Sequence, residues 1–537
     1  MDVSRIFYAS PPAPDTPVRP GKGITRLFLI LFIPLSLLLL LDAGLNMKWR
    51  MYHDAATMTY FAFLINHFHW VPYRDLFEMN MPGNHFFNAL AGRIFGYSDL
   101  GFRFLDLTTL SVLMLLTWAW LRRLGWKVAW AAMAGFCFHY YALGPIVSMQ
   151  REFLLLVPLS ASLVLLFTPV LKDGPKAFLI GLCFGSAFLI KPHIVLGYPV
   201  IFLFLLWEAR ERDGGGRLWS WRTLGLGAWT SAGFLLPVGL TVLYLWRNGA
   251  LLPFLDGARN YWPLYSEMSG GHRILTPDER WPYVWRSYLE FSGLRTLFWP
   301  LGVGLFIAFV NGRLSGARRR QVLLMGGMIL LYSFYAAFAG KFWPYHWLIF
   351  AYFLLATAAL CCVDQPAPTR MLLKIFPLLL FAGIVFSDVR FWRNLSFMAR
   401  GYTFYSPKIE RGDLIADFLR KNLRPGDKVQ PLDWTGGTHQ AMLAARAELA
   451  TPFFVDSSFY HHVSHPYIQK LRRQFIDDLK ASKPRFIVEV LDKDRPSGPD
   501  TTNRFEELEA YIAANYRPVV LQKKLRFIIY ERKAGAS

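Results

Sequence analysis

An apolar run followed by a polar insert near the start of the chain decides how the rest of the sequence is read. The run Leu27–Leu45 (LFLILFIPLSLLLLLDAGL) is long enough to cross a bilayer as a helix. It is followed by His53-Asp54 and then by Pro72–Gly83 (PYRDLFEMNMPG). The insert therefore places carboxylates, an arginine and histidines beside a membrane surface. This arrangement suggests a reaction on a lipid-borne substrate.

The composition agrees with a membrane protein. Only 18% of the 537 residues are charged and 17% are aromatic, which is too apolar for an ordinary soluble chain of this length. The apolar run after the N-terminal segment 1–26 is too long for a signal-peptide core and lacks a small-residue cleavage site, so we expect an uncleaved first helix. The four cysteines all lie in apolar runs, which argues against disulfides and against a cysteine-ligated metal.

The net charge of +21 raises the possibility of nucleic-acid binding, but the distribution of the charge excludes it. Basic residues gather between the apolar runs: Arg122, Arg123 and Lys127; Lys172 and Lys176; Arg210, Arg212, Arg217 and Arg222; Arg313, Arg318, Arg319 and Arg320; Arg370 and Lys374. Placing these connections in the cytoplasm satisfies the positive-inside rule. The segment 405–537, in contrast, has 22 basic and 17 acidic residues. The excess of basic residues therefore reflects the membrane topology of the chain and not nucleic-acid binding.

Eleven apolar runs predict a polytopic α-helical membrane protein with about eleven transmembrane helices. The runs are 27–45, 103–121, 128–147, 153–171, 177–190, 194–208, 224–246, 296–312, 321–340, 346–362 and 375–388. The pair around Lys191-Pro192-His193 is the least certain, because proline can also kink one long helix. An odd number of spans places the N-terminus in the cytoplasm and the C-terminus outside, in a plasma (inner) membrane.

On this topology the transmembrane domain covers 27–390 and has extracytoplasmic loops at 46–102 and 247–295. The second loop is rich in aromatic residues and contains Gly270-Gly271, so it is either a mobile flap or an interfacial aromatic belt. Segment 405–537 is expected to be a small extracytoplasmic α/β domain. Its predicted helices and strands are Ile409–Leu423, Lys428–Leu432, Ile468–Ala481, Phe486–Val490, Phe505–Asn515 and Arg526–Tyr530. Thr435–Thr438 (TGGT) lacks the lysine of a nucleotide-binding loop.

Most of the unusual polar residues fall on the predicted outside face. The carboxylates Asp54, Glu78 and Glu152 are candidate catalytic residues, because sugar transfer from a lipid-phosphate donor needs a base that takes the acceptor proton. The departing phosphate needs cations or other donors. Candidates for binding it are Arg74, Arg151, Lys191, His193, Lys341 and His346.

Each candidate also has a plain structural interpretation. Asp54 suits a helix N-cap, and Glu152 is able to pair with Arg151 or another basic residue. Arg74 and Asp75 often form a local turn and ion pair. His67, His69 and His85 suggest a metal only weakly, and the sequence gives no firm case for a divalent metal or another cofactor.

Five motifs in order resemble the GT-C superfamily of integral-membrane glycosyltransferases. They are an apolar helix, an acidic first loop with Pro-Tyr-Arg-Asp-x-Phe-Glu-x-Asn-x-Pro-Gly, and then Gln-Arg-Glu, Lys-Pro-His and Gly-Lys-x-Trp-Pro-Tyr-His. The relevant relatives depend on polyprenyl-phosphate sugars, as do the protein O-mannosyltransferases and the lipid A aminoarabinose transferase. The resemblance implies an inverting transfer with Asp54 as the first-loop catalytic acid.

Two departures from the family pattern are visible. The usual Asp-Glu pair reads Asp54-Ala55, and the common Lys-Pro-Pro of the loop reads Asn80-Met81-Pro82. Lys191, Lys341 or Arg74 would have to replace the missing lysine at the donor phosphate.

The sequence therefore predicts a glycosyltransferase that moves a sugar from a polyprenyl-phosphate donor to a glycan, glycolipid or protein acceptor of the cell envelope. One alternative is a lipid-linked glycan transporter or polymerase partner that binds without catalysing transfer. Transporters usually carry charges or broken helices near the bilayer midplane, whereas here the charges gather at one face. A cell-wall-binding scaffold is a weaker alternative, because eleven spans exceed the needs of an anchor.

Overall fold

The computed structural model of the chain describes residues 22–212, 221–310, 316–365, 370–401, 406–491 and 495–535. Most of the expected cytoplasmic N-terminal segment, together with Arg217 and Arg313, lies outside these residues. The chain divides into two compact units. Unit 1 consists of Met1–Lys48, Asp106–Leu240 and Arg286–Tyr402; unit 2 consists of Trp49–Leu105, Thr241–Trp285 and Thr403–Ser537.

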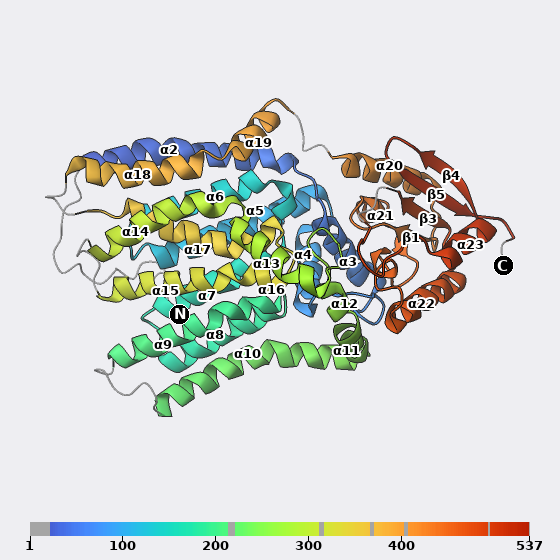
Figure 1. Cartoon of the computed structure of the whole chain (residues 1–537), viewed down its shortest axis with the longest axis horizontal. Coiled ribbons are helices and arrows are strands. Elements are labelled where there is room, and N and C mark those ends of the chain that lie inside the picture. Colours follow the sequence, from blue (N-terminus) through green and yellow to red (C-terminus); the bar gives the residue numbers. More distant parts are fainter. Residues whose placement is uncertain are drawn as a thin grey trace. The chain divides into compact units, whose positions relative to one another are not determined.

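Unit 1 is helical, and its long helices run side by side (Figure 1). They are α2 (Lys22–Leu45), most of α5 (Asp99–Leu121), α6 (Trp126–Leu143), α7 (Arg151–Phe167), α8 (Asp173–Phe188), α9 (Tyr198–Arg212), most of α10 (Trp221–Arg247), α14 (Phe298–Val310), α15 (Gly316–Ser333), α17 (Leu348–Ala358), α18 (Met371–Phe386) and α19 (Val389–Ala399). Short elements join them: η2 (Pro145–Val147), η3 (Pro192–Gly197), η4 (Phe291–Leu297), α16 (Tyr335–Ala339), η5 (Pro344–Trp347) and η6 (Ala359–Cys362).

Helix α17 forms the centre of unit 1. Its sequence, LIFAYFLLATA, is apolar on all sides, and every one of its residues is buried, as expected for a helix surrounded by others. One polar group in it is fully satisfied. The Tyr352 hydroxyl lies 2.8 Å from Thr117 Oγ1, accepts a hydrogen bond from Trp120 Nε1 at 2.9 Å and accepts another from Ser160 Oγ at 3.0 Å. This network joins α5, α7 and α17.

Helices α8 and α10 approach each other through glycines. A Cβ atom on Gly181 would lie 2.0 Å from the backbone oxygen of Thr230, and one on Gly233 would lie 2.0 Å from that of Phe178. Only glycine allows this separation. Small residues at the contact are typical of helix pairs in membranes, where close van der Waals packing drives association.

The structure has seven helices long and apolar enough to cross a membrane, or up to eight if the bent pair α18–α19 is one span, within the described residues. All eleven predicted runs fall on helices. With the bent pair counted, the difference from eleven arises at α6, α7 and α8. Helices α7 and α8 are 17 and 16 residues long, which at 1.5 Å per residue is roughly 24–26 Å against a hydrocarbon core of about 30 Å. Helix α6 has 18 residues but is less apolar, because it contains Lys127, His139 and two tyrosines. Its long apolar helices make the chain a multi-pass membrane protein.

Unit 2 contains the predicted α/β segment. Strands β1 (Lys428–Leu432), β2 (Glu448–Leu449), β3 (Phe486–Val490), β4 (Tyr516–Gln522) and β5 (Phe527–Arg532) form one sheet in the order β2-β1-β3-β5-β4. β1 is parallel to β2 and β3, whereas β5 is antiparallel to β3 and β4. Helices α20 (Pro407–Asn422), α21 (Thr438–Ala444), α22 (Pro466–Ser482) and α23 (Glu506–Asn515) accompany it (Figure 1). The predicted strand bounds of β1 and β3 are confirmed.

The first segment of unit 1 ends with η1 (Asn46–Lys48), and the N-terminal part of unit 2 contains α3 (Asp54–Phe68) and α4 (Pro82–Phe95). By sequence the run Met58–Phe68 of α3 is aromatic and apolar enough to lie along a membrane interface, but the structure packs it against protein. Tyr60 and Phe61 are buried by protein: the Tyr60 hydroxyl donates to the Ala447 carbonyl at 2.9 Å, and Phe61 packs edge-on against Phe454 at 4.5 Å. Apolar side chains are removed from water equally well by packing against protein as by facing lipid.

The aromatic loop 247–295 forms α11 (Leu251–Asn260), α12 (Trp262–Ser266) and α13 (Pro277–Glu290). Its two halves differ. Tyr261 belongs to the same hydrophobic core as Phe459 and Phe475 of the α/β segment, so the first half is an integral part of unit 2. Trp281 and Trp285 are 75% and 62% exposed, and only this half retains the interpretation as an interfacial belt.

Candidate functional site

A cluster around Glu152 brings together three of the motifs that the sequence singled out. Glu152 is the second residue of α7, and its side chain is completely buried. Its Oε1 accepts a hydrogen bond from Lys191 Nζ. The same oxygen lies 3.5 Å from His346 Nε2 and accepts a hydrogen bond from the Tyr335 hydroxyl at 3.4 Å. We call Glu152, Lys191, Tyr335 and His346 the Glu152 cluster.

Every member of the Glu152 cluster lies where a helix is interrupted. Lys191 stands between α8 and η3, and Pro192 suits the start of η3 because the first turn needs no backbone donor. Tyr335 begins α16 directly after α15. Gly340, in the left-handed conformation at φ 69°, ends α16 and allows the chain to turn toward His346 in η5. The breaks between apolar helices therefore place these polar side chains in the Glu152 cluster.

Further cations surround the Glu152 cluster. The positive charges of Arg151, Lys191 and Lys341 all act on His346. The His193 ring packs at a tilt against the ring of Tyr335, with centroids 5.5 Å apart. Lys341 is only 5% exposed. The cluster and its two neighbours Arg151 and Lys341 together carry three permanent positive charges and one buried carboxylate, so the local balance is positive. Such a site favours an anion.

Three buried atoms of this region have no hydrogen-bond partner among the described residues: Glu152 Oε2, His193 Nδ1 and His346 Nδ1. Buried polar atoms in folded proteins are nearly always paired, with protein, water or ligand. Their convergence around a positively charged cluster indicates a site that binds a polar ligand.

The structure bears out one structural alternative and adds a residue. Glu152 pairs with a basic residue, as that alternative proposed, and the residue is Lys191. Tyr335 was missed by the sequence reasoning. The available signal was a pair of tyrosines, Tyr332 and Tyr335, in an otherwise apolar run; Tyr332 also holds the neighbouring segment, donating to the Ile194 carbonyl at 2.8 Å.

Asp54 lies in unit 2 as the first residue of α3, and the preceding His53 takes the cap position. The N-cap interpretation of Asp54 is therefore wrong by one residue; its carboxylate instead benefits from the positive end of the helix dipole. Asp54 Oδ1 lies 2.9 Å from His53 Nδ1, and the Asp54 side chain is 23% exposed. His53 has φ 56°, an unusual conformation that is often found at functional sites.

Glu78 holds its own loop together. Its Oε1 accepts hydrogen bonds from the Met79 and Asn80 backbone N–H groups at 2.7 and 2.8 Å and from Asn80 Nδ2 at 2.7 Å. His85 Nε2 lies 4.0 Å from Glu78 Oε2. Such a carboxylate primarily orders the loop that follows it.

Arg74 and Asp75 form the local pair that the sequence offered as an alternative. Arg74 donates from Nε and Nη2 to the two Asp75 oxygens at 2.9 and 2.8 Å, and the Val71 backbone N–H donates to Asp75 Oδ2 at 2.7 Å. Burial raises the pKa of Asp75, but these hydrogen bonds and the Arg74 charge outweigh it, so the net pKa lies below the usual value.

Across the described part of the chain, no group of three or more histidine, cysteine or acidic side chains is arranged to hold a metal ion.

Comparisons with known proteins agree with the resemblance drawn from the motifs. Residues 80–236 match the family described as dolichyl-phosphate-mannose-protein mannosyltransferase. The fold is similar to the crystal structure of ArnT from Cupriavidus metallidurans bound to undecaprenyl phosphate, with a TM-score of 0.58 and 12% identity over 96% of this chain and 99% of that chain.

The crystal structure of the same protein in the apo state gives a TM-score of 0.57 and 13% identity over the same shares of the two chains. No curated protein matches the sequence. The resemblance to GT-C glycosyltransferases is thereby confirmed, and at this identity the structural likeness concerns the fold.

Proposed function

We propose that the protein is an inverting glycosyltransferase that moves a sugar from a polyprenyl-phosphate donor to a cell-envelope acceptor on the extracytoplasmic face of the inner membrane. The observation that carries the proposal is the Glu152 cluster, a buried and positively charged site with unpartnered polar atoms in a fold similar to that of ArnT. The ArnT structure holds undecaprenyl phosphate, a lipid whose phosphate requires such a site.

In this proposal Arg151, Lys191, His193, Lys341 and His346 bind the donor phosphate. Charge-assisted hydrogen bonds to phosphate oxygens are the strongest that these side chains form, and they stabilise the negative charge that develops as the phosphate departs. Glu152 holds Lys191 and His346 in place before the donor arrives. Arg74 is a further phosphate ligand only if it leaves its pair with Asp75.

The catalytic base of the proposal is Asp54. Its carboxylate takes the proton from the acceptor hydroxyl, the hydroxyl oxygen forms a bond to the anomeric carbon, and the bond from that carbon to the donor phosphate breaks. The prenyl phosphate leaves with the electron pair, and the configuration at the anomeric carbon inverts. Glu152 and Glu78 are the next candidates for the base, although Glu78 already accepts three hydrogen bonds within its loop.

The proposed topology has eleven spans, a cytoplasmic N-terminus and an extracytoplasmic C-terminus. It is supported by the alternation of basic connections along the sequence and by the presence of a helix at each of the eleven runs. Domain limits of 27–390 for the membrane part and 405–537 for the α/β part belong to the same proposal.

The test incubates the purified protein with radiolabelled polyprenyl-phosphate sugars and membrane extract, and follows label in the acceptor fraction. Asp54→Asn keeps the size of the side chain but removes the base, so we expect normal insertion and a loss of about 10²–10⁴-fold in turnover. The amide loses only the interaction of the carboxylate with the dipole of α3, about 0.3–1 kcal/mol, so the variant should still fold. Near-wild-type transfer by this variant would rule out Asp54, and label that crosses the membrane without reaching an acceptor would favour a transporter.

A further inference from the structure

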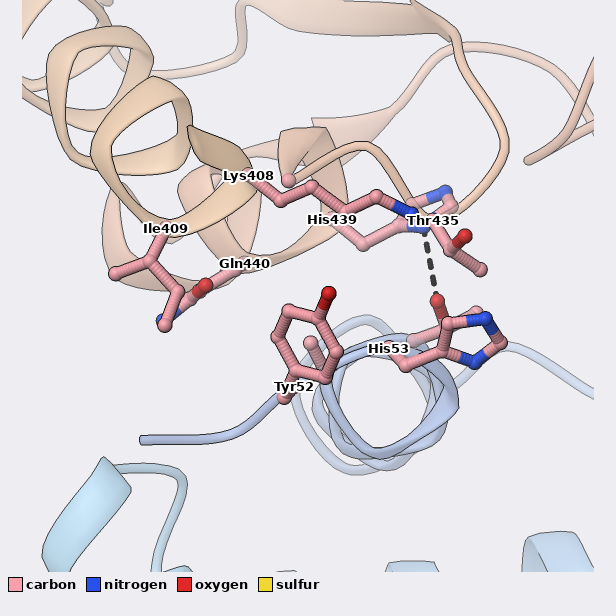
Figure 2. Close-up of a pocket in the computed structure, with 10 residues that line it drawn as sticks. Tyr52, His53, Lys408, Ile409, Thr435, His439 and Gln440 are labelled. Atoms are coloured by element: carbon pink, nitrogen blue, oxygen red, sulfur yellow. Dashed lines mark hydrogen bonds between the residues drawn. The ribbon is translucent and has the colours of Figure 1, made fainter. Parts of the chain in front are cut away.

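A small polar pocket lies in unit 2 between the segment that leads into α3 and the start of α20 (Figure 2). His53, Lys408 and Thr435 are among the residues that line it. The pocket has room for about one water molecule and therefore for no larger ligand. A surface with the chemistry of a binding site lies on helix α19 of unit 1.

Helix α19 follows directly on the apolar helix α18. The first helix ends at Phe386, the second begins at Val389, and the chain bends by 56° between them (Figure 1). The 11 residues of α19 measure about 16 Å, so at this angle the helix advances only about 9 Å along the direction of α18. The headgroup layer on each side of a bilayer is about 5–8 Å thick. With α18 as the last span, α19 therefore lies in or close to the headgroup layer.

One side of α19 is packed against the rest of unit 1. The ring of Phe391 is buried and stacks on the ring of Phe138 in α6, with centroids 3.9 Å apart. Asn394 Nδ2 donates to the carbonyl oxygens of Tyr141 and Ala142 at 3.4 Å. These contacts fix the rotation of α19 about its own axis, so the same side chains always face outward.

The outward side of α19 carries exposed apolar side chains. Val389, Trp392 and Phe397 are 75%, 44% and 41% exposed. Leu372 and Phe376 of α18 are exposed as well, as expected for a helix that faces lipid. The bilayer that covers the apolar side chains of α18 is therefore also the nearest apolar phase for those of α19.

Two arginines stand among these apolar side chains. Arg393 and Arg400 are exposed and seven residues apart, which is close to two helical turns, so both project from the same side of α19. Among the described residues neither has an ion-pair partner, whereas Arg390 donates to both carboxylate oxygens of Asp388. An arginine in a headgroup layer keeps its alkyl chain in apolar surroundings and extends its charge to the phosphates.

The position of these arginines departs from the positive-inside rule. On the proposed topology the other basic connections lie in the cytoplasm, whereas α19 follows the last span on the outer side. Short outer connections are poor in basic residues, so the orientation of the chain does not account for Arg393 and Arg400. A phosphate partner does, because a guanidinium group binds phosphate through two parallel charge-assisted hydrogen bonds.

We propose that the outward side of α19 is a binding surface for anionic phospholipid. Val389, Trp392 and Phe397 enter the boundary of the acyl chains, and Arg393 and Arg400 pair with headgroup phosphates. The helix thereby anchors the end of α18 at an anionic membrane surface. This inference does not depend on sugar transfer, since it needs only the membrane location of the chain.

Binding is measured at α19 itself, on purified full-length protein in detergent. Ser396 is exposed and lies three residues after Arg393 and four before Arg400, so it neighbours both on the helix surface. Ser396→Cys therefore carries an environment-sensitive dye, and labelled protein without this change corrects for the native cysteines. The probes are phosphatidylglycerol, phosphatidylcholine with the same acyl chains, and soluble glycerol 3-phosphate.

A basic residue near an anionic membrane surface strengthens binding by about fivefold. With two such residues, wild-type protein should bind the anionic phosphatidylglycerol about 25-fold more tightly than the zwitterionic phosphatidylcholine. Equal binding of the two lipids would overturn the anionic assignment. Displacement of phosphatidylglycerol by an equimolar amount of glycerol 3-phosphate would show that a soluble phosphate suffices, and would overturn the lipid assignment.

Two double variants locate the charge preference. Arg393→Gln/Arg400→Gln should bind both lipids alike, whereas Arg393→Lys/Arg400→Lys keeps the charges and should retain most of the preference. The matched control is Lys523→Gln/Lys524→Gln, which removes two exposed charges between β4 and β5 and should behave like wild type. An unchanged preference in the arginine-to-glutamine variant, or an equal loss in the control, would overturn the assignment to α19. The thermal midpoint of each variant shows that it is folded.

Discussion

Removal of the Glu152 charge should destabilise unit 1 strongly. Glu152→Gln keeps the shape of the side chain and an oxygen that accepts hydrogen bonds, but it eliminates the negative charge. The Lys191 side chain is only 13% exposed, and Glu152 is the carboxylate that it contacts. In the variant the ammonium group stays buried beside a neutral amide.

The expected loss of stability is large because the variant removes one of the two charges of a buried ion pair. Removing one partner of such a pair typically costs about 3–5 kcal/mol, since the other charge remains buried without compensation. The glutamine oxygen still accepts from Lys191, so we expect the lower end, about 3 kcal/mol, or roughly a hundredfold in the ratio of folded to unfolded protein. The double variant Glu152→Gln/Lys191→Met removes both charges and should recover much of this loss.

The assay follows the reaction of buried cysteines with a thiol-reactive dye during heating in detergent. Cys361 and Cys362 are buried, so dye labelling reports the opening of unit 1. The control is Glu290→Gln, whose side chain is 64% exposed and pairs with Arg286 at 3.9 Å. An exposed pair of this kind contributes about 0–1 kcal/mol.

Two results would refute the reasoning. One is a midpoint for Glu152→Gln that equals that of Glu290→Gln. The other is strict additivity, in which the double variant is as unstable as the two single variants combined. A coupling of about 0.5–3 kcal/mol is expected for residues in contact, and its absence would mean that Glu152 and Lys191 act independently.

The remaining predictions concern packing, the donor and the topology. Gly233→Ala should lower the thermal midpoint, because overpacking against α8 costs about 1–3 kcal/mol. In the control Gly239→Ala, in the same helix, the added Cβ meets no atom within 4 Å, so this variant should melt like wild type. Equal midpoints of the two variants would contradict the close approach of α8 and α10. Lys341→Ala should weaken affinity for a polyprenyl-phosphate sugar in a folded protein, and unchanged affinity would exclude Lys341 from the donor site. A C-terminal phosphatase fusion should be active and a green fluorescent fusion dark; the reverse pattern would invert the topology.

The local sequence predicted the elements well. Lys428–Leu432 and Phe486–Val490 are strands with the predicted bounds, and all eleven apolar runs are helical, because propensity and hydrophobic period depend only on neighbouring residues. The number of membrane spans could not be predicted equally well. Hydropathy does not state where a helix ends, so the lengths of α7 and α8, 17 and 16 residues, are known only from the folded structure.

The sequence by itself determined which residues carry charge between apolar helices, and hence that Glu152, Lys191 and His346 were candidates for one site. Only the tertiary structure decided their partners. Lys191 is 39 residues from Glu152 and Tyr335 is 183 residues from it, so no local pattern selects Lys191 over Arg151 or reveals Tyr335. The choice depends on how α7, α8 and α16 pack, because a buried carboxylate takes whichever donors the surrounding helices bring within reach.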